Sequence, residues 1–165
     1  MNRFPDRSQL GALMSRFPRA GRVEWLGVRP ARDAPVEPRE AIEAVEGRGV
    51  VGDRYAGRSG SRGVTLIQAE HLPVIAALSG LDGLDPMQLR RNVVVAGIPL
   101  IALKGRRFRI GEALFEGTGP CDPCSKMEAA LGEGAYNAMR GHGGLCARVV
   151  EGGWIRRGDP VVHVD

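Results

Sequence analysis

The sequence predicts one mostly β domain, a barrel of short strands with two or three short helices. Three observations support this fold class. The 24 glycines and 11 prolines are spread along the 165 residues, which is typical of many tight turns. The apolar segments between these turns are short, and they give a series of short strands. Strands and helices do not alternate regularly, which argues against a parallel sheet of βαβ units.

A chain of this length has room for one domain with a hydrophobic core. We expect residues 1–20 to form a leader segment and residues 21–165 to form the domain. Residues 8–17 of the leader predict a short helix, because Leu10, Leu13 and Met14 lie on one side.

The first half of the domain begins with two strands and two loops. Residues 22–29 alternate apolar and polar side chains, which predicts a strand, and the proline-rich residues 30–38 predict a loop. Residues 41–45 read as a second strand, with a helix as a close alternative. A long Gly/Arg-rich loop, 47–63, then leads into the apolar strand 64–67.

Helical signals follow. Apolar residues recur on one face of 68–78, which predicts a helix. Asp85 and Pro86 are typical of a helix start and predict one turn that ends at Leu89. Residues 91–95 predict a buried strand.

The last third alternates hairpins with short helices. Residues 106–110 and 113–116 predict a hairpin around a glycine turn. Short helices are expected at 124–131 and 135–139. The chain then ends on three strands separated by glycine turns, at 145–151, 154–156 and 161–164.

Composition narrows the classes of partner. The net charge of +4 comes mainly from arginines, whose forked donors suit phosphate or carboxylate ligands. Only 5% of residues are aromatic, so the stacking platform of a nucleic-acid binder is not expected. No apolar run approaches the ~18 residues of a membrane span. The N-terminus lacks the pattern of a secretory signal, so we expect a cytoplasmic protein with reduced cysteines.

The most distinctive motif is Cys121-x-x-Cys124, at the start of a predicted helix. Unpaired amide N–H groups in the first turn of a helix favour a thiolate, so both cysteines are candidate catalytic thiols. A thiolate serves as a nucleophile, a sulfur carrier or a soft-metal ligand. Two small buried core side chains are the structural alternative.

The sequence leaves two further roles open for the cysteines. Cys121, Cys124, His142 and Cys146 have spacings that suit a Cys₃His zinc site in a non-catalytic domain. Cys121 and Cys124 also resemble a thiol redox pair, although the preceding strand of a βαβ unit is missing.

Two other segments carry candidate anion-binding residues. Asp53 and Arg54 lie in the Gly/Arg loop, where glycines allow close backbone approach and arginines supply forked donors. Arg90, Arg91 and Asn92 lie where a helical turn meets a strand. Since neighbouring strand residues point to opposite faces, Arg90 and Asn92 are expected on one side and Arg91 on the other.

Several segments in this order resemble a stand-alone MOSC domain, a family named for the C-terminal domain of molybdenum cofactor sulfurase. The resemblance covers about residues 20–164. Its segments are GDRY at 52–55, VTLI at 64–67, RRNVVV at 90–95, GPCDPC at 119–124, GG at 143–144, ARVV at 147–150 and GWIRRGDPV at 153–161.

This resemblance implies a mostly β, barrel-like fold and binding of the pterin-based molybdenum cofactor, or transport of activated sulfur on a cysteine. By position Cys124 matches the family's molybdenum ligand, and Cys121 is the second thiol. Residues 90–93 match the family segment that lines the pterin pocket. His142 stands where small bacterial members carry Arg before the Gly-Gly pair. The sequence leaves open whether the protein is an oxidoreductase, a sulfur-transferase component or no enzyme.

The resemblance also suggests partners and roles. Lys126 is expected to steady the thiolate, and Asp53, Arg54, Arg90, Arg91, Asn92 and His142 complete the candidate cofactor site. Pyridoxal phosphate belongs to another domain of the sulfurase, and no lysine here is in a recognisable site for it. We therefore expect a small-molecule cofactor or a sulfur-donor protein, and a sulfurase or redox partner.

Overall fold

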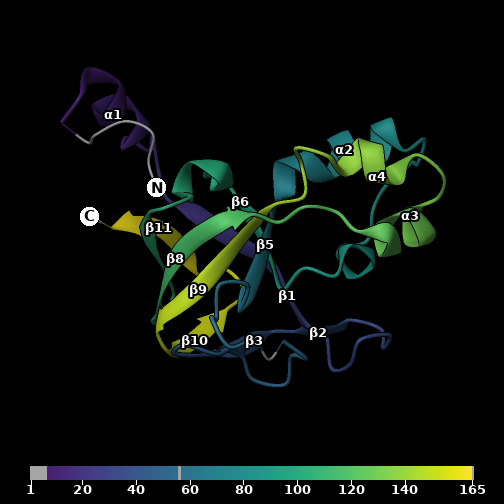
Figure 1. Cartoon of the computed structure of the whole chain (residues 1–165), viewed down its shortest axis with the longest axis horizontal. Coiled ribbons are helices and arrows are strands. Elements are labelled where there is room, and N and C mark those ends of the chain that lie inside the picture. The colour runs from purple at the N-terminus through teal and green to yellow at the C-terminus, as the bar shows by residue number, and fades with distance from the viewer. Residues whose placement is uncertain (1–6, 56, 165) are drawn as a thin grey trace.

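A computed structural model describes residues 7–55 and 57–164 of the chain, which fold into a barrel with a helical lobe beside it (Figure 1). The strands are β1 (Gly21–Val28), β2 (Glu37–Arg39), β3 (Ala41–Val45), β4 (Gly49–Val50), β5 (Val64–Gln68), β6 (Val93–Ala96), β7 (Arg107–Ile110), β8 (Ala113–Pro120), β9 (Leu145–Glu151), β10 (Gly153–Arg156) and β11 (Pro160–Val164). The helices are α1 (Gln9–Met14), α2 (Leu72–Leu78), α3 (Ser125–Leu131) and α4 (Ala135–Met139), with 3₁₀ turns η1 (Ala69–His71), η2 (Pro86–Leu89) and η3 (Leu100–Leu103).

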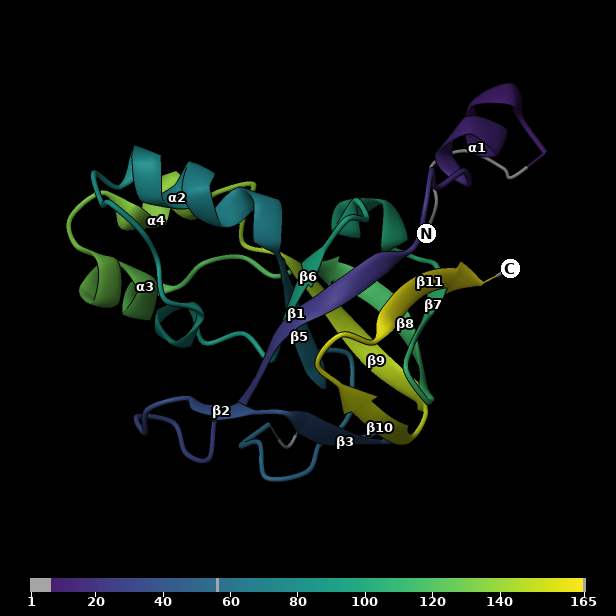
Figure 2. The ribbon, with the colours of Figure 1, turned by 180° about the vertical axis from the view of Figure 1, so that it is seen from behind.

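Seven strands close the barrel, in the order β11-β7-β8-β9-β5-β6-β1. Strand β1 pairs with β11 as well as with β6, so the sheet returns on itself (Figure 2). Closure leaves the barrel strands without unpaired edges. Strand β2 extends β1, and β10, β3 and β4 form a separate three-stranded sheet. The predicted mostly β barrel is confirmed, as are α1 in the leader and the three short helices.

Strands β5 and β6 are buried on both faces. All five residues of β5 are buried; Leu66 faces the barrel core, and Ile67 joins a second hydrophobic cluster. In β6, Val93 faces the barrel core and Val94 belongs to the second hydrophobic cluster. Strands covered on both faces read as unbroken apolar runs, which explains why these two segments do not alternate.

The second hydrophobic cluster lies between these two strands and the helices. Its buried members are Ile67, Ile75, Leu89, Val94, Met127, Leu131, Ala135 and Met139. We call η1, α2, η2, α3 and α4 the helical lobe. The pair β5–β6 is parallel, and η1, α2 and η2 make the crossover. The fold therefore holds one βαβ unit in an otherwise antiparallel barrel.

Strand β6 begins two residues later than the sequence predicts. Arg90 has a φ of 56°, the left-handed conformation, and ends η2 as its C-cap. This turn, enclosed by a capping box at Asp85 and Gln88, places Arg91 and Asn92 between helix and strand. The short strand β2 was also missed, inside the proline-rich segment predicted as a loop.

The leader helix α1 stands away from the barrel, close to the C-terminal end of the described chain (Figures 1 and 2). Its apolar residues Leu10, Leu13 and Met14 are exposed. The leader contacts the barrel through Phe17, whose ring lies 4.7 Å from that of His163. Among the described residues, no helix has the length and apolar character to cross a bilayer.

Candidate functional site

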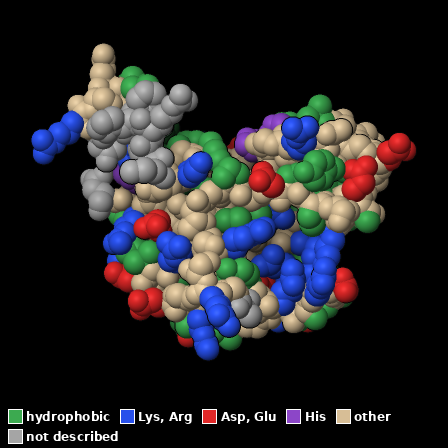
Figure 3. Space-filling model, viewed as in Figure 1, with side chains coloured by type: hydrophobic (Ala, Val, Ile, Leu, Met, Phe, Trp, Pro, Cys, Tyr) green, Lys and Arg blue, Asp and Glu red, His purple; other side chains and the backbone are tan. Residues whose placement is uncertain are grey.

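Arginine side chains gather in a hollow between the helical lobe and strands β2 and β3 (Figure 3). Two cavities that share Arg62 form this hollow, which we call the arginine cleft. The first, about 290 Å³, is lined by Arg29, Arg54, Tyr55, Arg62 and Thr65. The second, about 260 Å³, is lined by Ser61, Arg62, Thr118, Gly119, Pro120, Asp122 and Cys146. The cleft thus runs from three arginines to a thiol.

Arg29 and Asp53 form a buried, two-pronged ion pair at one wall of the cleft. The guanidinium donates to one carboxylate oxygen over 2.8 Å and to the other over 3.1 Å. The backbone N–H of Arg29 donates to the same carboxylate over 2.7 Å. Burial alone would raise the pKa of Asp53, but the hydrogen bonds and charge of Arg29, with help from Asn92, hold it below its usual value. Asp53 therefore fixes Arg29 instead of facing a ligand.

Asn92 is fully buried and connects three elements. Its amide donates to Asp53 Oδ1 and to the Gly27 carbonyl, each over 3.1 Å. Its oxygen accepts from the backbone N–H of Thr65 over 3.1 Å and from the Thr65 hydroxyl over 3.2 Å. Every hydrogen-bonding group of the side chain thus has a protein partner, so Asn92 supports the arginine cleft from behind.

Arg90 and Lys126 both hold the segment that follows Arg29. Arg90 donates to the carbonyls of Ala34 and Arg32 over 2.8 and 2.9 Å. Lys126 donates to the Arg32 carbonyl over 2.7 Å and pairs with Asp33 over 3.3 Å. Lys126 therefore contacts this loop, where the sequence suggested a contact with the thiolate.

Arg90 also belongs to the cationic cluster of the cleft. Burial lowers its pKa, and the charges of Arg29 and Arg54 lower it further, while Asp33 and Cys124 act in the opposite direction. The guanidinium of Arg29 donates to the Arg90 carbonyl over 3.4 Å, which places these two residues side by side. A mobile anion would relieve the repulsion among these guanidinium groups.

Arg91 has partners other than those of Arg90 and Asn92, but it precedes β6, so the alternation of a strand does not explain its direction. It is 6% exposed and donates to the carbonyls of Gly143, Leu89 and Cys121, over 2.9, 3.1 and 3.1 Å. Its guanidinium therefore joins the Gly-Gly segment to the cysteine segment, and its charge lies near the thiol of Cys121.

The three cysteines are free and fall into two environments. Cys124, the N-cap of α3, is exposed. Cys121 and Cys146 are buried, and their thiols are hydrogen-bonded to each other. That hydrogen bond, against the effect of burial, lowers the pKa of Cys121 to about 6 with help from Arg91, Arg62 and Arg29. The same hydrogen bond raises the pKa of Cys146. The thiol beside Cys121 is therefore Cys146, from the neighbouring strand.

The zinc-site alternative is wrong. Among the residues that the structure describes, no three His, Cys, Asp or Glu side chains are placed to hold one metal ion. His142 instead lies edge-on to His71, with ring centroids 5.1 Å apart, and its Nδ1 is 3.3 Å from the Ala138 carbonyl oxygen. His142 thus belongs to the helical lobe, and the four expected ligands do not converge.

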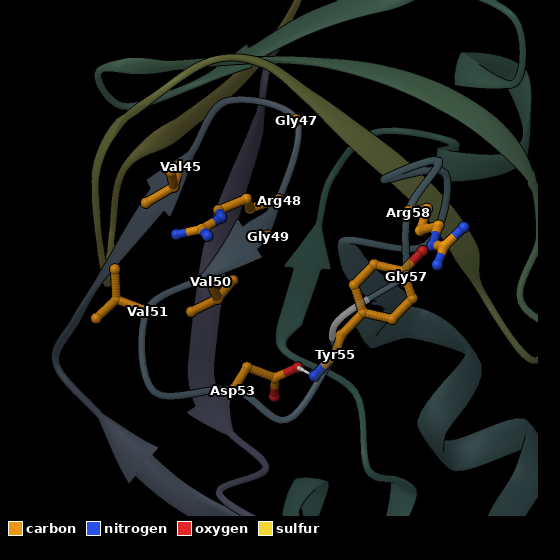
Figure 4. A pocket seen from close by; sticks show the side chains of 10 residues that line it. All are labelled: Val45, Gly47, Arg48, Gly49, Val50, Val51, Asp53, Tyr55, Gly57 and Arg58. Carbon is orange, nitrogen blue, oxygen red and sulfur yellow. Dashed lines mark hydrogen bonds between the residues drawn. The ribbon is translucent and has the colours of Figure 1, made fainter.

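A larger cavity, about 590 Å³, lies on the other side of Tyr55 (Figure 4). It is lined by the β3–β4 hairpin and by Asp53, Tyr55, Gly57 and Arg58. Figure 4 shows Asp53 accepting a hydrogen bond from the backbone N–H of Tyr55, at 3.3 Å. The described part of this cavity is lined by no cysteine, so the arginine cleft is the stronger candidate for chemistry.

Two cleft residues were missed or misjudged from the sequence. Arg29 lies between the end of β1 and a proline, and its partner Asp53 is 24 residues away, so no local pattern connects them. Cys146 begins an apolar strand and was read as core or zinc ligand. Cys146 pairs with Gly119 across β8 and β9, a pairing that no local pattern in the sequence shows.

A family model for the MOSC domain matches residues 51–162. The chain belongs to the MOSC domain family. Its fold is similar to that of the YuaD protein from Bacillus subtilis, with a TM-score of 0.79 and 20% identity over 91% of this chain and 98% of that one. It is also similar to YiiM from Geobacillus stearothermophilus, with a TM-score of 0.71 and 18% identity over 88% and 75% of the two chains. Among curated proteins, no sequence matches the chain.

YiiM from Escherichia coli is a further structural relative of this MOSC protein. It has a TM-score of 0.69 and 20% identity, over 90% of this chain and 71% of that one. At such identities the likeness concerns the fold.

Proposed function

We propose that this MOSC-domain protein binds an anionic, pterin-type molybdenum cofactor in the arginine cleft. The observation that carries the proposal is the convergence of Arg29, Arg54 and Arg62 on one cavity, with Arg90 beside them. Forked guanidinium donors match the oxygens of a phosphate group. The cleft therefore offers the charge that such a cofactor needs.

The residues present fit this group in a second respect. Molybdenum bound through sulfur prefers soft ligands, and the exposed thiol of Cys124 lies within electrostatic reach of Arg90. When bound, the cofactor supplies two-electron oxygen-transfer chemistry at molybdenum. Arg54 and Arg62 would bind its phosphate, Arg29 would be kept in place by Asp53, and Cys124 would be the protein ligand.

Elemental analysis and pterin fluorescence test the proposal on protein from cells supplied with molybdate. We expect molybdenum and pterin near one per chain in the wild type. Arg54→Gln together with Arg62→Gln should lower both at least about tenfold, because two charge-assisted contacts are lost. Cys124→Ser should lower the molybdenum content more than the pterin content.

Arg109→Gln is the matched control. Arg109 is exposed on β7, where it pairs with Glu151 over 2.9 Å, and it does not line the cleft. Its variant should keep the cofactor at the wild-type level. Equal loss in the control and the cleft variants would assign the effect to net charge and contradict the proposed site.

Sulfur transport is the second candidate function, and the exposure of Cys124 favours it. An exposed thiol is accessible to the persulfide of a donor protein such as a sulfurase, whereas Cys121 is not. In that case persulfide labelling of freshly purified protein should mark Cys124, and the label should disappear in Cys124→Ser. A wild type without molybdenum, pterin or persulfide would exclude both functions. We expect a cytoplasmic setting, where free thiols persist.

A further inference from the structure

Cys121 and Cys146 are neighbours across two strands of the barrel. Cys146 pairs with Gly119, and the backbone N–H of Cys121 donates to the Gly144 carbonyl over 2.9 Å. The two cysteines are thus diagonal neighbours on the same face of the β8–β9 ladder. This register brings the two side chains close together, and each is the strongest influence on the pKa of the other.

The surroundings stabilise a negative charge on one of these thiols. The Cys146 thiol has the Pro120 carbonyl as an acceptor at 3.9 Å, and the cations Arg91, Arg62 and Arg29 act on Cys121. Arg91 is fixed in this place by its hydrogen bond to the Cys121 carbonyl. The pKa of Cys121 is therefore lowered and that of Cys146 is raised, so a negative charge on the pair is favoured at Cys121.

Access to the pair is narrow. Cys121 is 2% exposed and Cys146 is 4% exposed, so bulky thiol reagents are excluded. Cys146 nevertheless lines the cavity of about 260 Å³ at the end of the arginine cleft. A molecule of a few atoms can enter this cavity and reach Cys146, and Cys121 lies next to Cys146 on the same face of the ladder.

We propose that Cys121 and Cys146 form a peroxide-reactive thiol pair, in which Cys121 is oxidised first and Cys146 resolves it as a disulfide. The thiolate is the reactive form of cysteine, and a second thiol beside it is the usual arrangement of a reversible redox site. This inference does not rest on the proposed function, although its cavity belongs to the arginine cleft, and it assigns a role to two cysteines that the proposed function does not use.

The chemistry balances with hydrogen peroxide as the oxidant. The Cys121 thiolate attacks one peroxide oxygen, an S–O bond forms, the O–O bond breaks, and the released hydroxide takes a proton to become water. The Cys146 sulfur, losing its proton, then attacks the Cys121 sulfur. The S–S bond forms, the S–O bond breaks, and the second oxygen leaves as water. Two thiols are oxidised and one peroxide is reduced.

Intact-mass analysis of the full-length protein after hydrogen peroxide treatment tests the proposal. The wild type and Cys124→Ala should both lose two hydrogen atoms, and peptide mapping should link Cys121 to Cys146. Cys146→Ala should instead gain one oxygen atom in the intact mass, as a sulfenic acid that peptide mapping locates on Cys121. Cys121→Ala should show neither product. A link to Cys124, or a wild type that accumulates sulfenic acid without a disulfide, would overturn the proposal.

A second measurement tests whether Cys146 activates Cys121 and separates this effect from a change in the fold. Thiolate absorbance in the ultraviolet should titrate with a midpoint near 6 in the wild type and in Cys124→Ala. The midpoint should rise in Cys146→Ala and return toward the wild-type value in Cys146→Ser, whose hydroxyl restores a donor. An unchanged midpoint in correctly folded Cys146→Ala would show that Cys146 does not activate Cys121.

Discussion

Asn92 donates its side-chain amide to the Asp53 carboxylate over 3.1 Å and thereby connects β6 to the loop that carries Arg54. Asp53 in turn holds Arg29 at the wall of the arginine cleft. The cationic site thus rests on a neutral amide buried behind it. Its stability and its shape depend on the same few hydrogen bonds.

Asn92→Ala should lower the free energy of unfolding by about 3 kcal/mol, since buried donors and acceptors would lose their partner. Denaturant unfolding measures the change. Asn137→Ala is the matched control, because Asn137 is exposed on α4 and should change stability by less than about 0.5 kcal/mol. Similar losses in both variants would contradict a special role for the buried amide.

Low pH should lower the free energy of unfolding, in part through Asp53. The folded state lowers the pKa of Asp53, so its contribution is present above the usual carboxyl pKa of about 4 and is lost as the pH falls below it. We expect the free energy of unfolding to fall more steeply between about pH 5 and 2 in the wild type than in Asp53→Asn. Parallel pH profiles of the two proteins would refute this linkage.

A similar linkage with a different pH window applies to Cys121. Its pKa is lowered from 9.0 to about 6 in the folded state, so the unfolded chain binds more protons between these values. Stability should therefore rise with pH across this range, by at most about 4 kcal/mol at ~1.4 kcal/mol per pH unit. The rise should disappear in Cys121→Ser, as chemical denaturation at a series of pH values would show. A wild type with the same profile as this variant would argue against a buried thiolate.

The Gly-Gly segment should tolerate no side chain at its first position. A Cβ on Gly143 would lie 2.1 Å from the Cys121 carbonyl oxygen, a backbone atom that also accepts from Arg91. Gly143→Ala should therefore lower the free energy of unfolding by about 3 kcal/mol or more. Gly119→Ala is the control, because a Cβ there meets nothing within 4 Å. If the Gly143 variant is as stable as the control, the two backbones are not in close contact.

Much of the fold could be predicted from local patterns. The apolar strands β5, β6 and β9 were recognised because a buried strand needs unbroken or alternating apolar residues. The closure of β1 on β11 could not be predicted, since their pairing joins residues near both ends of the chain. Residue Arg90 shows a second limit, because its left-handed φ depends on the cap that ends η2.

The candidate site, too, could be predicted only in part from the sequence. The sequence by itself determined that the domain is mostly β, because turn residues and short apolar segments are visible along the chain. The order of its motifs resembles that of a MOSC domain, and this order pointed to the segments around Arg54, Arg90 and Cys121. Only the tertiary structure decided that Arg29 and Arg62 share the cleft, and that the thiol facing Cys121 comes from β9. Barrel closure sets these pairings, and the sequence separation of the partners hides them. The charge interactions and the thiol chemistry depend on distances in space between these residues, and only the folded structure gives those distances.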